Sequence, residues 1–273
     1  MRTILYANCD YLAYTVRECL QVSINPSSKN FVMDTPPQFT HFDAAIVDLD
    51  GTMVDTLGDF VAALNLMLGD LSMAAVARER VARWVGKGSE NLIKHALALD
   101  YPENIAINWE ANDAQDLYAK AWGSYQRHYL AINGQYSSVY PGVVTGLQHL
   151  KVRGLKLACL TNKPTAFALA LLKAKGLHGF FEMTFGGDAF VRKKPDPLPL
   201  LETCKALGTL PQRTLMIGDS SNDAQAARAA GCPVLLVTYG YNHGEPVEAV
   251  DADGFIDSLE NPACYGSPVL PAI

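Results

Sequence analysis

Two carboxylates stand two residues apart in the stretch Asp48-Leu49-Asp50-Gly51-Thr52, where an apolar run ends at a glycine. Neighbouring acids repel each other, so they need a cation or a shared proton, and a divalent metal ion is the natural partner. With a metal bound, one carboxylate can stay ionised as a nucleophile while the other moves a proton. Taken alone, the pair is more typical of a solvated turn, so its interpretation depends on the rest of the chain.

Donors suited to a phosphoryl group follow later in the chain. Thr161 and Asn162 offer a hydroxyl and an amide that can hold a phosphoryl oxygen, although such residues before Pro164 are also typical of the start of a helix. Lys194, which precedes Pro195, can supply the positive charge that a phosphate dianion needs. A single loop lysine is usually solvated, so its significance depends on its neighbours in the fold.

A second pair of carboxylates, Asp219 and Asp223, lies in the stretch Gly-Asp-Ser-Ser-Asn-Asp that begins at Gly218. Carboxylate oxygens suit the coordination shell of a hard cation. The alternative is that Ser220 and Asp223 cap a helix that begins near Ala224. Each of these groups is ambiguous alone, and their combination favours one metal-assisted site over several unrelated turns.

The elements that must position these residues are strands alternating with helices. Short apolar runs at 42–52, 155–164, 214–223 and 234–240 are typical of buried parallel strands. Helical patterns cover 164–176 and 224–231, and Gly231 suits a left-handed helix end. The alternation predicts an α/β fold, a doubly wound parallel sheet, whose strands end in polar residues where such sheets bind ligands.

The block 57–140, between the first two strands, has a different pattern. It contains no comparable strand run, and its apolar residues recur at helical spacing. The first such stripe is Leu57, Phe60, Val61, Leu64 and Leu68. Gly86-Lys87-Gly88-Ser89 predicts a turn between two helices, and Pro141-Gly142 marks the return to the sheet. We therefore expect an inserted helical domain over 57–140.

In this order the four groups, D-x-D-G-T, a hydroxyl residue, K-P and G-D-x-x-x-D, resemble the motifs of the haloacid dehalogenase-like hydrolase superfamily. The resemblance covers roughly residues 42 to 260. It implies a Rossmann-like core formed by 41–56 and 141–273, which carries an α-helical cap domain over 57–140.

The resemblance also implies a role for each matching residue. Asp48 is then the nucleophile that forms an aspartyl-phosphate, and Asp50 is the acid that protonates the leaving group and the base that later activates water. The phosphoryl group would be held by Thr161, Asn162 and Lys194. A Mg²⁺ cofactor would be held by Asp48, the main-chain carbonyl of Asp50 and Asp219, with Asp223 supporting them or binding through water.

Further stretches resemble the bacterial phosphoglycolate phosphatases, namely 83–97, 161–165, 186–200, 218–233 and 238–246. This implies a small phosphomonoester substrate, 2-phosphoglycolate, that is hydrolysed to glycolate and phosphate. A substrate that bears a carboxylate would be helped by Arg83, Lys87 or Lys163. Met53 and Thr56 stand where that family more usually has Leu and Ser, and both changes keep size or the hydroxyl.

Other activities share the same four groups. A sugar-phosphate phosphatase, a pyrophosphatase and a β-phosphoglucomutase-like mutase all remain open, and a mutase would protect its aspartyl-phosphate from water. Outside enzymes, the chain could be a regulatory binding protein that kept the fold and lost turnover. The complete set of matching residues argues against that alternative, because clustered carboxylates are costly to maintain without a function. The set is Asp48, Asp50, Thr161, Lys194, Asp219 and Asp223.

Composition excludes some partners. The 273 residues include 22 Lys and Arg against 28 Asp and Glu, a formal net charge of −6, so we expect no nucleic-acid partner. No run of about 18 apolar residues occurs, so we expect no membrane span. The six cysteines form no C-x-x-C pair, which predicts reduced thiols in a cytoplasmic protein, with Cys159 and Cys232 buried.

The first 40 residues, 1–40, combine a weak apolar pattern with polar and proline-rich sequence. They do not form a signal peptide, because Asp10 and Arg17 interrupt the apolar region. They are either an appended element or upstream sequence translated from a start codon set too early, and we favour the second, with Met33 as the start. The intact mass of the protein made from its native gene distinguishes the two.

Overall fold

The structure, a computed structural model, describes residues 42–100 and 108–261, all within one compact unit that spans Gln38–Ile273. The extension expected over 1–40, with its start at Met33, lies outside the described residues. So do three of the six cysteines, Cys9, Cys19 and Cys264.

Six parallel strands form the central sheet, in the order β5-β4-β1-β6-β7-β8. They are β1 Ala44–Val47, β4 Lys156–Leu160, β5 Met183–Phe185, β6 Thr214–Gly218, β7 Val234–Val237 and β8 Gly254–Ile256. The chain builds β4 and β5 on one side of β1 and then returns to build β6 on the other side. Because the order reverses at β1, the carboxyl ends of β4, β1 and β6 border the crevice where such sheets bind ligands.

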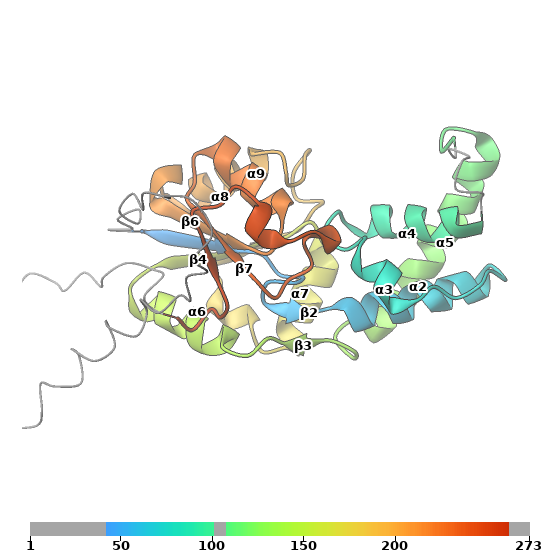
Figure 1. Ribbon diagram of the computed structural model, residues 1–273, viewed down its shortest axis with the longest axis horizontal. Coiled ribbons are helices and arrows are strands. Elements are labelled where there is room, and N and C mark those ends of the chain that lie inside the picture. The colour runs from blue at the N-terminus through green and yellow to red at the C-terminus, as the bar shows by residue number, and fades with distance from the viewer. Residues whose placement is uncertain (1–41, 101–107, 262–273) are drawn as a thin grey trace, which may run out of the picture. The chain divides into compact units, whose positions relative to one another are not determined.

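Helices cover both faces of this sheet (Figure 1). They are α6 Val143–Val152, α7 Thr165–Ala174, α8 Leu198–Leu207 and α9 Ser221–Ala230. Successive side chains of a strand point to opposite faces. Ala45 and Val47 of β1 therefore pack in the cluster that includes α6 and α7, while Ala44 and Ile46 pack in the cluster with α8 and α9. This is the doubly wound α/β arrangement that the sequence predicts.

A separate group of helices follows the first strand: α2 Leu57–Asp70, α3 Arg78–Ala82, α4 Ser89–Leu97 and α5 Asn112–Ile132. Their apolar faces form a cluster of their own. Most of the predicted stripe is buried in it, including Phe60 and Leu64, while Val61 is half-buried. We call these four helices the cap. No helix in the described ranges combines the length and apolar character needed to cross a bilayer.

Two short antiparallel strands, β2 Val54–Asp55 and β3 Ser138–Val139, connect the sheet to the cap. The predicted helical block 57–140 thus includes the short strand β3, which is too short to give an apolar run and is defined by its pairing with β2. Short 3₁₀ helices occur at Ala98–Asp100, His178–Phe180, Pro211–Arg213, Asn242–Gly244 and Val247–Ala249.

Candidate active site at the carboxyl ends of three strands

The carboxyl ends of β1, β4 and β6 bring three predicted site residues together. The register pairs Val47, the last residue of β1, with Cys159 and Ile217, each one residue before the end of its strand. Asp48, Thr161 and Asp219 follow directly after β1, β4 and β6. The N–H of Asp48 donates a hydrogen bond to the carbonyl of Ile217 at 2.9 Å, which extends the β1–β6 pairing to the site. Residues far apart in the sequence thus lie at one edge of the sheet.

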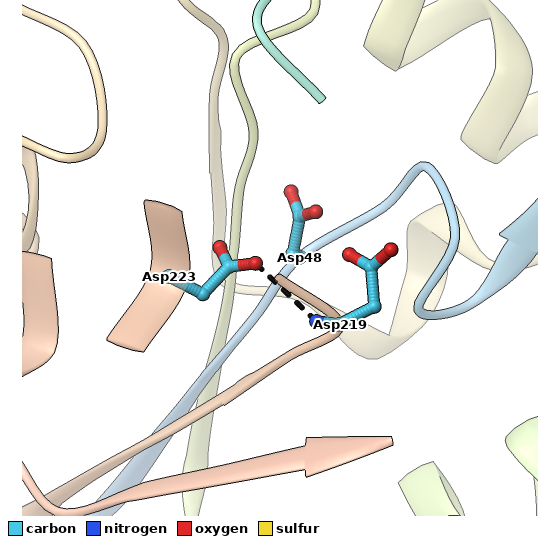
Figure 2. A group of neighbouring side chains, drawn as sticks. All are labelled: Asp48, Asp219 and Asp223. Atoms are coloured by element: carbon cyan, nitrogen blue, oxygen red, sulfur yellow. Dashed lines mark hydrogen bonds between the residues drawn. The ribbon is translucent and has the colours of Figure 1, made fainter. Parts of the chain in front are cut away.

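Asp48, Asp219 and Asp223 point toward a common centre (Figure 2). Each offers a carboxylate oxygen within 4.8 Å of the others, and all three are buried. Burial raises the pKa of Asp48 to about 7, although the nearby Lys194 opposes this rise. Burial, together with Asp223 and Asp48, also raises the pKa of Asp219 well above its usual range. Buried carboxylates with raised pKa values lack compensating positive charge, which a divalent cation would supply.

Asp223 has both carboxylate oxygens engaged. Its Oδ2 accepts hydrogen bonds from the N–H of Asp219 at 3.3 Å, the N–H of Ser220 at 3.2 Å and the Ser220 hydroxyl at 2.8 Å. With Ser220 it forms the capping box of α9, so the capping alternative considered for these residues is present. Its Oδ1 accepts from Lys194 at 2.6 Å. Asp223 therefore holds the loop that carries Asp219.

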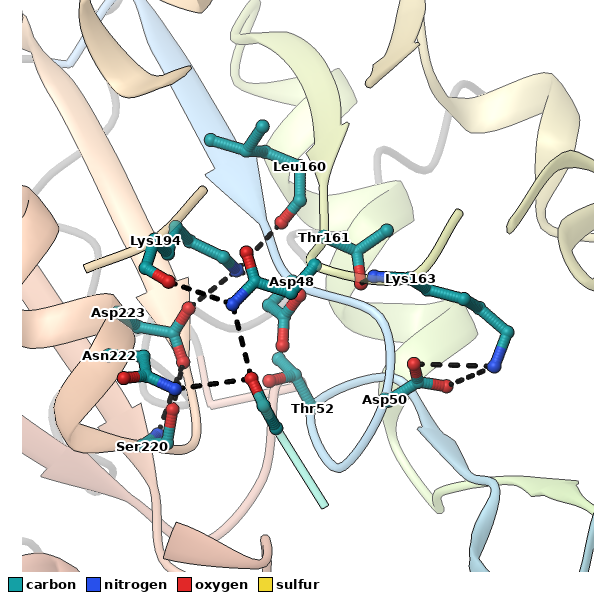
Figure 3. A network of polar contacts seen from close by, with 12 residues as sticks. Asp48, Asp50, Thr52, Leu160, Thr161, Lys163, Lys194, Ser220, Asn222 and Asp223 are labelled. Atoms are coloured by element: carbon teal, nitrogen blue, oxygen red, sulfur yellow. Dashed lines mark hydrogen bonds and ion pairs between the residues drawn. The ribbon is translucent and has the colours of Figure 1, made fainter. Parts of the chain in front are cut away.

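Lys194 lies between two carboxylates (Figure 3). Its Nζ is 2.9 Å from Oδ1 of Asp48 and 2.6 Å from Oδ1 of Asp223, and it donates to the carbonyl of Leu160 at 2.9 Å. Burial by itself lowers the pKa of Lys194, but Asp223 and Asp48 outweigh it, so the pKa lies above its usual range. The structure thus fixes a charged ammonium beside the predicted nucleophile.

Thr161 and Asn162, the two residues after β4, differ in whether their side-chain polar groups are already engaged by the protein. Thr161 is buried at the site, and its Oγ1 accepts a hydrogen bond from the N–H of Lys163 at 3.2 Å. The side-chain amide of Asn162 donates to the carbonyls of Lys194 at 2.9 Å and Gly86 at 3.1 Å. In this structure both N–H groups of the Asn162 amide therefore join segments of the protein, and its phosphate-binding role stays a prediction.

Asp50 has its own cationic partner. Lys163 Nζ donates to both carboxylate oxygens of Asp50, at 3.0 and 3.3 Å, and both side chains are buried. Of the three basic residues predicted to help a carboxylate-bearing substrate, Lys163 is the one at this site. Arg83 and Lys87 are exposed on the cap.

The predicted turn between α3 and α4 contacts the sheet domain through main-chain carbonyls. The carbonyl of Gly86 accepts from the amides of Asn162 and Asn222, each at 3.1 Å. His243 lies 2.8 Å through Nδ1 from the carbonyl of Val85 and 3.2 Å through Nε2 from the Asn222 amide. Burial lowers the pKa of His243, which favours a neutral ring that donates at Nδ1 and accepts at Nε2. The cap is thus held closed over the strand ends.

A cavity of about 20 Å³ remains under the closed cap, enough for about one water molecule. Its lining residues are Asp48, Asp50, Phe60, Gly86, Gly88, Ser89, Leu92, Thr161, Asn162, Lys163, Lys194, Ser220, Asn222 and Asp223. Phe60, Leu92 and Asn222 are not among the predicted site residues, because apolar residues at helical spacing predict only helix packing and Asn222 is not a charged group. The position of Asn222 inside the second acidic motif is the signal that could have identified it.

Comparisons with known proteins agree with this architecture. A family model described as haloacid dehalogenase-like hydrolase matches residues 42–231. The phosphoglycolate phosphatase of Thiobacillus denitrificans is 42% identical over 220 residues, 81% of this chain and 93% of its own length. That of Shigella boydii is 35% identical over 234 residues, 83% and 90% of the two chains. The crystal structure of a predicted phosphoglycolate phosphatase from Haemophilus somnus gives a TM-score of 0.73 at 31% identity. The match covers 82% of this chain and 98% of that one.

The chain therefore belongs to the haloacid dehalogenase-like hydrolases. It is an enzyme of the hydrolase class, and its relatives include phosphoglycolate phosphatases. The α/β fold and the family resemblance predicted from the sequence are both confirmed.

Proposed function

We propose that the chain is a Mg²⁺-dependent phosphatase that hydrolyses a small phosphomonoester. Its preferred substrate in this proposal is 2-phosphoglycolate, which is hydrolysed to glycolate and phosphate. Relatives that align with about four-fifths of the chain bear the corresponding name. The observation that carries the proposal is two buried ion pairs at one cavity, Asp48 with Lys194 and Asp50 with Lys163. We assign the first pair to the phosphoryl group and the second to the leaving group.

The acidic residues fit a hard divalent cation. The donors available are carboxylate oxygens, buried and short of positive charge, and Mg²⁺ prefers such oxygen ligands. In this proposal Asp48, the main-chain carbonyl of Asp50 and Asp219 hold the ion, while Asp223 supports Asp219. When bound, the ion offsets the negative charges of the phosphoryl group and of the carboxylates around it.

The first step uses Asp48 as the nucleophile. One of its carboxylate oxygens bonds to phosphorus while the bond from phosphorus to the leaving oxygen breaks. Lys194, which lies 2.9 Å from Asp48, and the Thr161 hydroxyl hold oxygens of the transferred group. Asp50 acts in its protonated form at this stage, in which it still accepts a hydrogen bond from Lys163. It gives its proton to the leaving oxygen, so glycolate departs with a neutral hydroxyl group there.

The second step reverses the role of Asp50. A water molecule attacks phosphorus while Asp50 takes one of its protons, and the bond from phosphorus to the Asp48 oxygen breaks. Phosphate is released and both carboxyl groups return to their starting states. The turn between α3 and α4 covers the strand ends, so the closed cap limits which nucleophiles reach the intermediate.

The test is phosphate release from a panel of phosphorylated metabolites, with Mg²⁺ and with EDTA. We expect a Mg²⁺-dependent kcat/KM that is highest for 2-phosphoglycolate and lower for sugar phosphates and pyrophosphate. Asp48→Asn should abolish release with circular dichroism unchanged, because an amide cannot form the phosphoryl ester. A preference for sugar phosphates would reject the substrate, and release by Asp48→Asn equal to wild type would reject the nucleophile.

We also propose that the enzyme works in the cytoplasm and that its partner is the phosphomonoester substrate itself. Cys159, Cys204 and Cys232 are free and buried, which suits a reducing compartment.

A further inference from the structure

Lys163 is a buried lysine that connects the sheet domain to the cap. Its exposed fraction is 3%, and its Nζ lies beside both carboxylate oxygens of Asp50 (Figure 3). The ring of Phe60, from α2, lies 4.4 Å from Nζ, and the ring of Tyr129, from α5, lies 4.7 Å from it. Aromatic faces stabilise a cation but take the place of water around it. Such a cation interacts strongly with any further anion that reaches it.

We propose that Lys163 selects the leaving group, by binding a carboxylate carried on the carbon next to the ester oxygen. The proposal rests on the phosphatase function above, in which Asp50 passes its proton to the leaving oxygen. The leaving group then lies beside Asp50, and Lys163 is within hydrogen-bond distance of that same carboxyl group. In 2-phosphoglycolate a single CH₂ separates the ester oxygen from the carboxylate, so the carboxylate comes within reach of Lys163 Nζ.

The other cations near the site are placed differently. Lys194 is engaged by Asp48 and Asp223 and serves the phosphoryl group. Arg83 and Lys87 are exposed and are not among the residues that line the cavity. Among the lining residues, Lys163 is therefore the cation that remains for a second anionic group.

Lys163 also has a donor to offer. An ammonium group has three N–H donors. The contacts to the two oxygens of Asp50 use at most two of them, and within the described ranges Asp50 is the hydrogen-bond partner of Nζ. A substrate carboxylate can therefore bind Lys163 without displacing Asp50.

The walls of the cavity favour a short anionic group over a sugar. Phe60 and Leu92 present apolar surface, which offers no hydrogen bonds to the hydroxyl groups of a polyol. Gly88 and Ser89 line the cavity at the start of α4, where the helix dipole adds partial positive charge. The cavity thus places the Lys163 ammonium near two apolar side chains, in a small space whose other walls are mainly polar.

The experiment compares two substrates that differ in the carboxylate, 2-phosphoglycolate and 2-hydroxyethyl phosphate, in the Mg²⁺-loaded full-length enzyme. Lys163→Met keeps the apolar stem and removes the charge. The lost contact to Asp50 affects both substrates, so it cancels in the ratio of their kcat/KM values. We expect that ratio to fall by about 10- to 100-fold, the usual effect of a lost hydrogen bond to a charged group. Lys163→Arg, which keeps the charge, should restore part of the ratio.

Lys87→Met is the matched control, because it removes an exposed lysine from the cap loop. It should change the ratio by less than about twofold. If Lys163→Met does not fold, Lys163→Gln gives the same comparison, since it keeps a donor for Asp50 without the charge. An unchanged ratio in the Lys163 variants, or a ratio that falls only in Lys87→Met, overturns the proposal while the phosphatase function stands. A wild-type enzyme that releases no phosphate from either substrate contradicts the proposed function itself.

Discussion

The main-chain N–H of Tyr241 donates a hydrogen bond to Oδ2 of Asp219 at 2.8 Å. The hydroxyl of the same residue reaches the connection to the cap. It accepts from the N–H groups of Thr56 at 2.8 Å and Leu57 at 3.0 Å, and it donates to Oδ1 of Asp55 at 2.7 Å. One residue therefore contacts both a proposed metal ligand and the start of α2, where N–H groups lack helical partners.

Tyr241→Phe should destabilise the protein more than it weakens metal binding. The variant keeps the ring and the main-chain bond to Asp219, but it leaves two N–H groups and Asp55 without the hydroxyl. We expect the free energy of unfolding to fall by about 1–3 kcal/mol in urea titrations. Tyr136→Phe, at a tyrosine that is 60% exposed, should stay within about 0.5 kcal/mol. A wild-type free energy of unfolding in Tyr241→Phe would contradict the role of the hydroxyl.

Gly240→Ala should weaken Mg²⁺ binding. A Cβ at Gly240 would lie 2.1 Å from Cβ of Asp219, so the loop or the carboxylate must move. We expect the Mg²⁺ dissociation constant, measured by calorimetry, to rise by about tenfold or more. Gly69→Ala in α2 is the control, because its Cβ meets nothing within 4 Å and alanine favours a helix. Equal Mg²⁺ affinities in Gly240→Ala and wild type would show that Asp219 tolerates the displacement.

The metal-free protein should lose thermal stability as the pH rises from about 4 to about 7. The pKa of Asp48 is raised from 3.8 to about 7 in the folded state, so its stabilising contribution is present at low pH and is lost as the pH rises through about 7. Added Mg²⁺ should raise Tm more at the higher pH, because a protonated carboxyl group does not bind the ion. Thermal unfolding with EDTA and with Mg²⁺ measures both effects.

Asp48→Asn is the control for this pH dependence. Asparagine does not titrate, so the metal-free Tm should depend less on pH, although Asp219, whose pKa is also raised, keeps part of the slope. The same slope in Asp48→Asn and wild type would assign the titration to other groups.

The sequence predicts those parts of the site that depend on strand ends. Asp48, Thr161 and Asp219 each follow an apolar run directly, and parallel strands bring their carboxyl ends to one edge, so the meeting of these residues follows from the pattern. The capping alternative at Asp223 is present together with its ion pair to Lys194, because a carboxylate has two oxygens that can serve separate partners.

What the sequence could not predict depends on pairing between distant segments. The strand β3 has two residues and exists through its partner β2, so no local pattern marks it. The sequence also does not show which of Lys163 and Lys87 is buried, because each stands beside a glycine or a proline. In the structure α2 and α5 pack over Lys163, and that packing between distant segments buries it.

Asn222 and His243 should control how often the cap opens. The Asn222 amide contacts the Gly86 carbonyl and the His243 ring, so Asn222→Ala removes both contacts and leaves the Asn162 bond to Gly86 in place. We expect amide hydrogen exchange around residues 85–88 to become about fivefold faster, because a hydrogen bond between the turn and the sheet domain contributes about 1 kcal/mol to the closed state. The KM of the enzyme should change with it, since substrate enters through the opened cap. Asn108→Ala, at an exposed asparagine before α5, should leave the exchange unchanged. Wild-type exchange in Asn222→Ala would mean that the Asn162–Gly86 and His243–Val85 contacts suffice to keep the cap closed.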